Sequence, residues 1–245
     1  MIQDGFFNIL DTVDSTNNYA MAMVKAGRAC HGMLWFTQEQ TAGKGQRGKN
    51  WIMEPGKNIA MSLVLKPEKL QIKQQFQLNA AIALACFDFF SGYAGEETKI
   101  KWPNDMFWRD RKAGGVLIEN IFQGKDWKWA VVGIGININQ TKFDKSLVNP
   151  VSLKQITGKD FDTLVLAKKL YELLMKKVSG QKVNSAEKMM QIYNSQLYKL
   201  NRSVVLKKDN IKFETVIKAV TIQGCLITVD KMERQFNFGE VEWVL

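Results

Sequence analysis

The stretch QTAGKGQRGKNW, residues 40–51, decides between several nucleotide-binding folds, because two well-known phosphate-binding patterns overlap within it. Its glycines match the dinucleotide fingerprint GxGxxG, and residues 43–49 match GxxxxGK, most of the triphosphatase phosphate loop. Both patterns require a helix directly after the glycines, with its N-terminal amides facing the phosphates. The next residues, WIMEPGKN, cannot begin such a helix, and Asn50 stands where the triphosphatase loop needs Ser or Thr. Neither of these two folds is therefore predicted.

With both patterns excluded, the stretch still combines glycines with basic residues in a way that suits anion binding. Its glycines let backbone amides approach a ligand closely, and Lys44, Arg47 and Lys49 alternate with them before the aromatic Trp51. We interpret it as an anion-binding loop. The alternative is a charged hairpin turn that binds nothing.

Composition narrows the class of protein. With 245 residues, of which 46% are hydrophobic, the chain can form one large domain, or a large and a small one. The start lacks the features of a signal peptide, and no run of about 18 apolar residues is present, so we expect a cytoplasmic protein without contact to a membrane. Cys30, Cys86 and Cys225 have no metal-binding spacing and are expected to be buried, reduced thiols. His31 is the only histidine, which excludes multi-histidine metal sites, and no metal ligand is predicted.

The net charge of +10 invites a nucleic-acid interpretation. Between Lys159 and Lys212, however, 12 basic and 5 acidic residues supply +7 of this charge, and the lysines lie mostly between apolar helix positions. A solvated lysine face is the simpler explanation. A surface that attracts an acidic partner is the alternative.

Hydrophobic periodicity predicts a mixture of helices and strands. Strands are expected at 6–10, 32–40, 58–65, 98–102, 114–122 and 129–139, and helices at 18–27, 70–93, 162–178 and 185–197. After about residue 200 only short strands are expected, at 214–222, 225–230 and 234–245. This order predicts an α+β fold, a mixed sheet with packed helices, followed by a small β-barrel.

Three further motifs carry groups that could meet the glycine loop. KWPND places Lys101 at the end of a strand, before a proline that fixes the chain. RKAGG places Lys112 directly before glycines of minimal size. GIGIN places glycines inside a strand, where they mark either a ligand against the backbone or close packing of the sheet.

In their order and spacing, DSTN (14–17), QTAGKGQRG (40–48), KWPND (101–105), RKAGG (111–115) and GIGIN (133–137) resemble the motifs of biotin protein ligases of the type without an N-terminal DNA-binding domain. The resemblance implies a catalytic domain over residues 1–198, with a core similar to class II synthetases, and a C-terminal SH3-like β-barrel over 199–245. It also implies a two-step reaction. Biotin and MgATP give biotinyl-5′-AMP and pyrophosphate, and a lysine of a biotin carboxyl carrier protein then takes the biotinyl group.

The resemblance also assigns roles to single residues. Lys101 is the implied catalytic residue. The implied adenylate-binding residues are Lys44, Arg47, Trp51, Asn104, Lys112 and Asn137. The implied biotin-binding residues are Ser15, Thr16, Asn17, Gln40, Lys44, Gly45, Gln46, Lys101 and Gly115.

Two departures from the family pattern modify these expectations. The family loop often reads GRGRRG, whereas this chain has GKGQRG, so Gln46 stands in place of an arginine. We hypothesise that Arg47 or Lys49 compensates in holding the adenylate. Some members also carry a helix-turn-helix of about 60 residues ahead of the catalytic domain, but DSTN begins here at residue 14, so we expect no specific DNA binding.

Two other functions remain open on the sequence alone. A lipoate or octanoyl ligase shares the core fold but has different motifs. A non-catalytic, basic nucleic-acid-binding module built on the terminal barrel is a more remote alternative, since that barrel has few basic residues past Lys218. A homodimer is possible, formed by β-rich runs such as WAVVGIGININ pairing across a two-fold axis.

Overall fold

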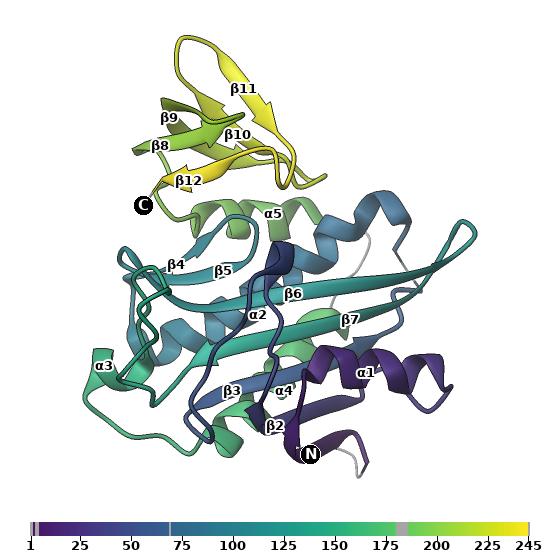
Figure 1. Ribbon diagram of the computed structural model, residues 1–245. Helices are drawn as coiled ribbons and strands as arrows, with labels where there is room; N and C mark the ends of the chain where they lie inside the picture. Colours follow the sequence, from purple (N-terminus) through teal and green to yellow (C-terminus); the bar gives the residue numbers. More distant parts are fainter. Residues whose placement is uncertain (1, 3–4, 69, 180–185, 245) are drawn as a thin grey trace.

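The computed structural model describes residues 2, 5–68, 70–179 and 186–244 (Figure 1). Within these residues the chain forms a seven-stranded and a five-stranded sheet, with helices packed on the first. The larger sheet has the order β1-β2-β3-β7-β6-β5-β4, and its neighbours are antiparallel except β1 and β2. Its strands are β1 (Phe7–Val13), β2 (Leu34–Gln40), β3 (Asn58–Leu65), β4 (Thr98–Lys101), β5 (Asp105–Trp108), β6 (Arg111–Gln123) and β7 (Asp126–Asn137).

One face of this sheet carries the main hydrophobic core. Helix α2 (Gln75–Ala94) lies across it and packs against α4 (Thr163–Ser179), as Figure 1 shows. Strand β3, NIAMSLVL, is buried at every position, which requires cover on both faces. Among the described residues, no helix combines the length and the apolarity needed to span a bilayer.

The opposite face of the sheet is covered by the much shorter α1 (Thr16–Lys25). Ala20 and Val24 of this helix pack on Trp35, Val64 and Val131 in a second, smaller apolar cluster. This cluster lies under the C-terminal half of α1. The N-terminal turn of the helix instead carries polar side chains against the sheet, which prepares a polar region on this face.

The second sheet follows helix α5 (Ala186–Ser195), which lies between it and the first sheet in Figure 1. The side-chain amide of Asn194 joins α5 to this sheet, since it donates to Val220 O (3.0 Å) and accepts from Val220 N (2.8 Å). The sheet is antiparallel, in the order β11-β10-β9-β8-β12. Its strands are β8 (Ser203–Lys208), β9 (Ile211–Val220), β10 (Leu226–Val229), β11 (Glu233–Phe236) and β12 (Glu242–Val244).

Most of the expected elements are present, with four differences. Strand β5 and the short helix α3 (Leu153–Thr157) were not expected, because each is too short for a periodic pattern. Strand β8 was not expected either, since the strands predicted for this part of the chain begin only at residue 214. The run 234–245, expected as one strand, is divided by a turn in which Glu240 N donates to Asn237 O (3.1 Å). The predicted division of the chain between residues 198 and 199 stays a prediction, and residue 185 of the last expected helix lies outside the described residues.

The expected pairing of WAVVGIGININ across a two-fold axis is wrong. These residues belong to β7, which pairs with β3 along one edge and with β6 along the other. Both edges of the strand are therefore used within the chain.

The three cysteines are all unpaired, as expected, but only Cys86 is fully buried. Its burial raises the pKa of the Cys86 thiol to about 12, so the thiol is unreactive at neutral pH. Cys30 is exposed, contrary to expectation, because it lies in the turn between α1 and β2.

Candidate active site

A polar network joins the first turn of α1 to three strands of the larger sheet. Gln40 Oε1 accepts from the backbone N–H of Thr16 (2.9 Å) and from its hydroxyl (3.1 Å). Ser62 Oγ lies 2.8 Å from Thr16 Oγ1 and donates to Asn17 Oδ1 (2.6 Å). Asn17 Nδ2 in turn donates to Glu119 Oε2 (2.8 Å). The structure thus brings three of the predicted biotin-binding residues, Thr16, Asn17 and Gln40, into one partly buried network.

Two members of this network were missed from the sequence, although each leaves a signal. Ser62 is the only hydroxyl in the apolar run NIAMSLVL, and Glu119 is the only acid in GGVLIEN. Ser15 is buried beside the network in the N-cap position, but its side chain makes no capping hydrogen bond. The side chain of Gln40 instead satisfies the first free amide of the helix.

The glycine loop forms a tight hairpin. Lys44 and Asn50 form a bridge, Gly45 N donates to Lys49 O (2.6 Å), and Trp51 N donates to Gly43 O (2.8 Å). A Cβ at residue 43 would collide with the carbonyl of Trp51, so glycine is required there by close approach.

This hairpin lies next to the DSTN segment. Ala42 N donates to Asp14 O (2.8 Å). The pKa of the Asp14 carboxyl is lowered chiefly by the hydrogen bond from Asn18, and the charge of Lys44 adds to the effect. Two of the five sequence motifs are therefore in contact.

Gln46 connects the loop to KWPND and to the core helix. Its Nε2 donates to Asn104 Oδ1 (2.7 Å) and to Val116 O (2.8 Å). Asn104, itself buried, donates through Nδ2 to Asn79 Oδ1 on α2 (2.8 Å). This relay from the loop to helix α2 was not foreseen, since the three residues lie far apart in sequence.

The glycines of β7 accommodate side chains of the site itself. A Cβ at Gly135 would collide with the ring of Trp51, and one at Gly133 would collide with the side-chain amide of Asn17. Trp51 therefore packs flat against the strand, directly after the glycine loop. Close packing, one of the two alternatives for these glycines, is what the structure shows.

Lys101 lies at the end of β4 with its amine over two aromatic rings. Its Nζ is 5.0 Å from the ring centre of Phe107 and 5.2 Å from that of Trp243. Burial lowers the pKa of Lys101 to about 8, although the charge of Asp105 opposes this effect. The amine is thus still mostly protonated at pH 7.

Lys112 of the RKAGG motif acts electrostatically on Lys101, and Asn137 of the GIGIN motif lies beside the backbone of Lys112. Lys112 Nζ forms an ion pair with Asp105 Oδ2 (2.7 Å), and a Cβ at Gly115 would come within 2.8 Å of that carboxylate and 3.3 Å of Lys112 Nζ. Asn137 donates to Val151 O (3.1 Å), so its side chain braces the backbone. Its assignment to the adenylate stays a prediction.

Arg47 points toward strand β12 of the second sheet, the strand that also carries the aromatic partner Trp243 of Lys101. Its Nη1 lies 3.9 Å from Glu242 Oε1 on β12, and both side chains are about half exposed, so the pair contributes little to stability. Its backbone is in the left-handed region (φ 56°), which is uncommon for a residue other than glycine.

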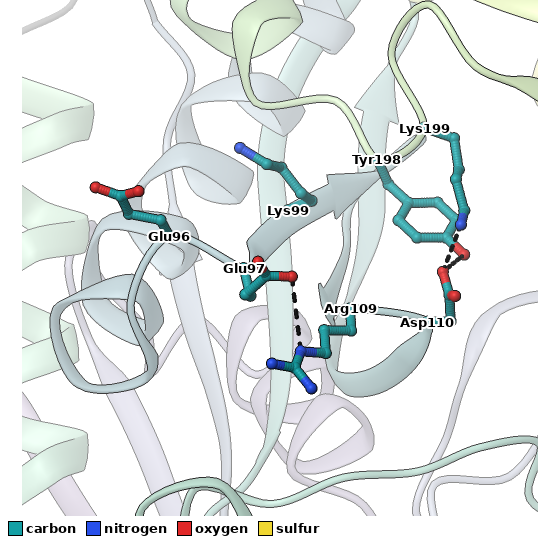
Figure 2. Close-up of a pocket in the computed structure, with 7 residues that line it drawn as sticks. All are labelled: Glu96, Glu97, Lys99, Arg109, Asp110, Tyr198 and Lys199. Carbon is teal, nitrogen blue, oxygen red and sulfur yellow. Dashed lines mark hydrogen bonds and ion pairs between the residues drawn. The ribbon is translucent and has the colours of Figure 1, made fainter.

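A surface hollow of about 390 Å³ lies at the outer end of the β4–β5 hairpin (Figure 2). Its charged side chains pair with each other, as in Arg109 with Glu97 (3.7 Å) and Lys199 with Asp110 (2.7 Å). None of the predicted site residues lines it. The hollow is lined by Glu96, Glu97, Lys99, Arg109, Asp110, Tyr198 and Lys199.

Within the described residues, no three His, Cys, Asp or Glu side chains lie close enough together to bind a metal ion. A divalent cation reaching this site would therefore depend on a ligand's own oxygens for much of its coordination.

Comparisons with known proteins agree with this arrangement of motifs. Residues 9–137 match the Biotin/lipoate A/B protein ligase family. The biotin--[acetyl-CoA-carboxylase] ligase of Paracoccus denitrificans is 34% identical over 161 residues, 63% of this chain and 65% of that protein. The bifunctional ligase/repressor BirA of Escherichia coli is 29% identical over 151 residues, 60% of this chain and 45% of that protein. The chain spans about half the length of several such curated relatives.

Solved structures share the fold over nearly the whole chain. The biotin protein ligase of Aquifex aeolicus in complex with biotin and ATP superposes with a TM-score of 0.81, covering 96% of this chain and 97% of that chain at 24% identity. The enzyme from Leishmania major in complex with biotinyl-5-AMP gives a TM-score of 0.67 at 20% identity, covering 94% of this chain and 98% of that chain. Both similarities include the C-terminal sheet and confirm the expected α+β fold with its small second sheet.

Proposed function

Because the chain belongs to the biotin/lipoate A/B protein ligase family, we propose that it is a biotin protein ligase. It joins biotin to ATP, forming biotinyl-5′-AMP and releasing pyrophosphate. It then transfers the biotinyl group to a lysine of a biotin carboxyl carrier protein. The observation that carries this proposal is the contact of Gln46 with Asn104, which joins the glycine loop to the strand end that presents Lys101.

Biotin is assigned to the polar network beneath α1. The ureido group of biotin has two donors and one acceptor, while the rest of the molecule is apolar except for its carboxylate, so its pocket needs a few fixed polar groups among apolar ones. Thr16, Asn17 and Gln40 supply such groups, and their mutual hydrogen bonds fix their orientation. Ser62 and Glu119 are added to the proposed binding residues on the same ground.

The first step brings a carboxylate to a phosphorus that is surrounded by negative oxygens. Fixed positive groups lower its barrier if their interaction grows as charge moves onto pyrophosphate. Lys101 and Lys44 supply this charge, with Arg47 and Lys112 as further candidates. A magnesium ion carried in with ATP would add positive charge at the phosphates.

The second step needs a neutral amine on the carrier and a stabilised leaving group. The amine attacks the carbonyl carbon of biotinyl-5′-AMP, the bond from that carbon to the phosphate oxygen breaks, AMP departs with the electron pair, and the new amide nitrogen releases one proton to solvent. Protonated Lys101 stabilises the negative charge on AMP. Adenine is assigned to the region of Trp51, whose ring offers a flat apolar surface.

Lipoate or octanoyl attachment is the alternative within the family. The names of the Paracoccus and Aquifex relatives support biotin. Exchange of labelled pyrophosphate into ATP that is stimulated by biotin and not by lipoate is the expected result. The reverse preference would assign the chain to lipoate.

The Lys101→Ala variant tests the mechanism. We expect adenylate formation to fall about a hundredfold to a thousandfold, by analogy with the loss of one preorganised donor in other active sites. Carrier labelling from preformed biotinyl-5′-AMP, measured separately, should also fall. A variant that forms the adenylate at the wild-type rate would remove Lys101 from the mechanism.

A further inference from the structure

The amine of Lys101 has aromatic rings as its direct partners. Among the residues that the structure describes, Nζ forms no hydrogen bond or ion pair. Phe107 comes from the neighbouring strand β5, but Trp243 comes from β12, in the other sheet. An ammonium over an aromatic face is attracted by the negative charge density of that face, and the attraction strengthens when water is excluded.

These two rings are held in place by a third. Tyr198 lies between them, with ring centres 5.0 Å from Phe107 and 5.7 Å from Trp243. Its hydroxyl donates to Asp110 Oδ1 (2.7 Å), and Lys199 Nζ pairs with the same carboxylate, as Figure 2 shows. Asp110 and Lys199, which line the surface hollow, therefore fix the position of Tyr198 and with it the aromatic cluster around Lys101.

We propose that Trp243 is a positioning residue for the reaction, holding the Lys101 ammonium between its own ring and that of Phe107. This inference rests on the proposed function, in which Lys101 acts on the phosphate. It makes the last strand of the C-terminal sheet part of the active site. The long lysine side chain has many rotamers, and two fixed rings restrict them before the substrate arrives.

Other contacts attach the C-terminal sheet to the hairpin, so Trp243 is not required for docking alone. Trp102 Nε1 donates to Gly224 O (2.9 Å), and the ring of Trp102 meets that of Phe238 edge-on at 6.0 Å. The indole N–H of Trp243, by contrast, is buried and has no hydrogen-bond partner among the described residues. The interactions of the Trp243 side chain are therefore the contacts of its ring with Lys101 and Tyr198.

The burial of Lys101 sets the sign of the pH effect. Asp105, Lys112 and Lys49 act on the amine, but burial is the larger influence and lowers its pKa from 10.5 to about 8. The adenylation rate should therefore fall as pH rises through about 8, where Lys101 loses its proton. Removing the Trp243 ring takes away a contact that favours the charged amine, but it also admits water. Because burial is the largest influence on this amine, the pKa should move back toward 10.5 and the fall should shift to higher pH.

The test compares Trp243→Ala and Trp243→Phe with Phe238→Ala in the full chain. The titration of the Lys101 amine is followed by NMR with ¹³Cε-labelled lysine, and its resonance is assigned by its absence in Lys101→Met. Biotin-dependent pyrophosphate exchange is measured against pH. We expect Trp243→Ala to raise the Lys101 pKa and to lower kcat about tenfold, with little change in the KM for biotin.

The matched variants separate positioning from docking. Trp243→Phe keeps an aromatic face and should restore most of the rate, whereas Phe238→Ala loosens the same interface without touching Lys101 and should leave rate and titration unchanged. Should Trp243→Ala not fold, Trp243→Leu replaces it, and the same loss of rate relative to Trp243→Phe is expected.

Two results would overturn the inference: an unchanged Lys101 titration in Trp243→Ala, or equal losses in Phe238→Ala and Trp243→Ala. If the wild-type chain exchanges no pyrophosphate, the proposed function fails. The titration then still shows whether Trp243 holds the amine.

Discussion

At the scale of single residues, Gln46 holds the glycine loop by neutral hydrogen bonds. The family pattern often has an arginine at this position. Gln46 uses both protons of its side-chain amide, on Asn104 and on Val116 O. An arginine has more donors and a charge that an adenylate phosphate would attract. In this chain, Gln46 instead joins the loop to Asn104 and to strand β6. Binding of the phosphate is therefore expected of neighbouring residues such as Arg47 or Lys49.

This difference leads to a prediction about Gln46. Replacing it with alanine removes two hydrogen bonds, and each contributes about 0.5–1.5 kcal/mol. We expect biotinyl-5′-AMP to dissociate about tenfold faster from Gln46→Ala, as measured with labelled adenylate. Hydrogen exchange of the loop amides without ligand should also accelerate.

Arg47→Ala serves as the companion variant. The ion pair of Arg47 with Glu242 is long and half exposed, so its loss should change the free energy of unfolding little. Faster loss of the adenylate from Arg47→Ala would support compensation for the missing arginine. If Gln46→Arg retains the adenylate better while Arg47→Ala behaves as wild type, the hypothesis that Arg47 compensates is wrong.

At the scale of elements, β7 works as a flat support for the segment after the glycine loop. Gly133 and Gly135 present no side chain, so Asn17 and Trp51 lie directly on the strand. The loop, helix α1 and the strand therefore share one surface. A glycine inside a strand usually weakens it, and here that cost is offset by the approach of two site residues.

Gly135→Ala tests this support. The added methyl group would overlap the Trp51 ring, and overpacking of this kind typically destabilises a protein by about 1–3 kcal/mol. We expect a lower free energy of unfolding in urea and weaker ATP binding, since Trp51 is displaced.

Gly92→Ala is the control for this prediction, because a methyl group there meets nothing within 4 Å and the position lies in helix α2. It should stabilise the protein by about 0.5–1 kcal/mol without affecting ATP. Equal ATP affinity in Gly135→Ala and in wild type would show that Trp51 does not contact the nucleotide.

At the scale of the whole molecule, two sheets meet at the β4–β5 hairpin, and the net charge is +10. The hairpin presents Lys101 to Phe107 of the first sheet and to Trp243 of the second, and Trp102 to the second sheet. The lysines at positions 168, 169 and 176 of α4 are exposed, in agreement with a solvated lysine face. A positively charged surface attracts acidic partners over several ångströms, and dissolved salt screens this attraction.

A carrier protein with acidic residues around its acceptor lysine should therefore be labelled more slowly at high ionic strength. We expect kcat/KM for the carrier to fall by about tenfold between about 0.05 and 0.5 M salt, through slower association. Lys168→Glu combined with Lys176→Glu should reduce this dependence while pyrophosphate exchange stays unchanged. A carrier rate that is insensitive to salt would leave the lysine face as a solvated surface only.

Much of this protein could be determined from the sequence by itself. Periodic apolar positions predicted all four longer helices and most strands, because burial of one face is a local pattern. The glycine loop was separated from two better-known phosphate motifs by the residues that follow it, and the five motifs identified the family. Asp162 is of a residue type that favours helix N-caps, and its carboxylate accepts from the amides of Leu164 and Val165 (2.9 Å each) at the start of α4.

Only the tertiary structure decided which of these motifs touch. The contacts of Gln46 with Asn104, of Asn17 with Glu119 and of Lys101 with Trp243 join residues from separate elements. Each depends on the order of strands in the sheet and on how the second sheet docks, and no local pattern encodes either. The same order placed β7 in the interior, where no partner chain can reach its edges. Local hydrophobic periods therefore specify the elements, whereas long-range pairing and packing specify the site.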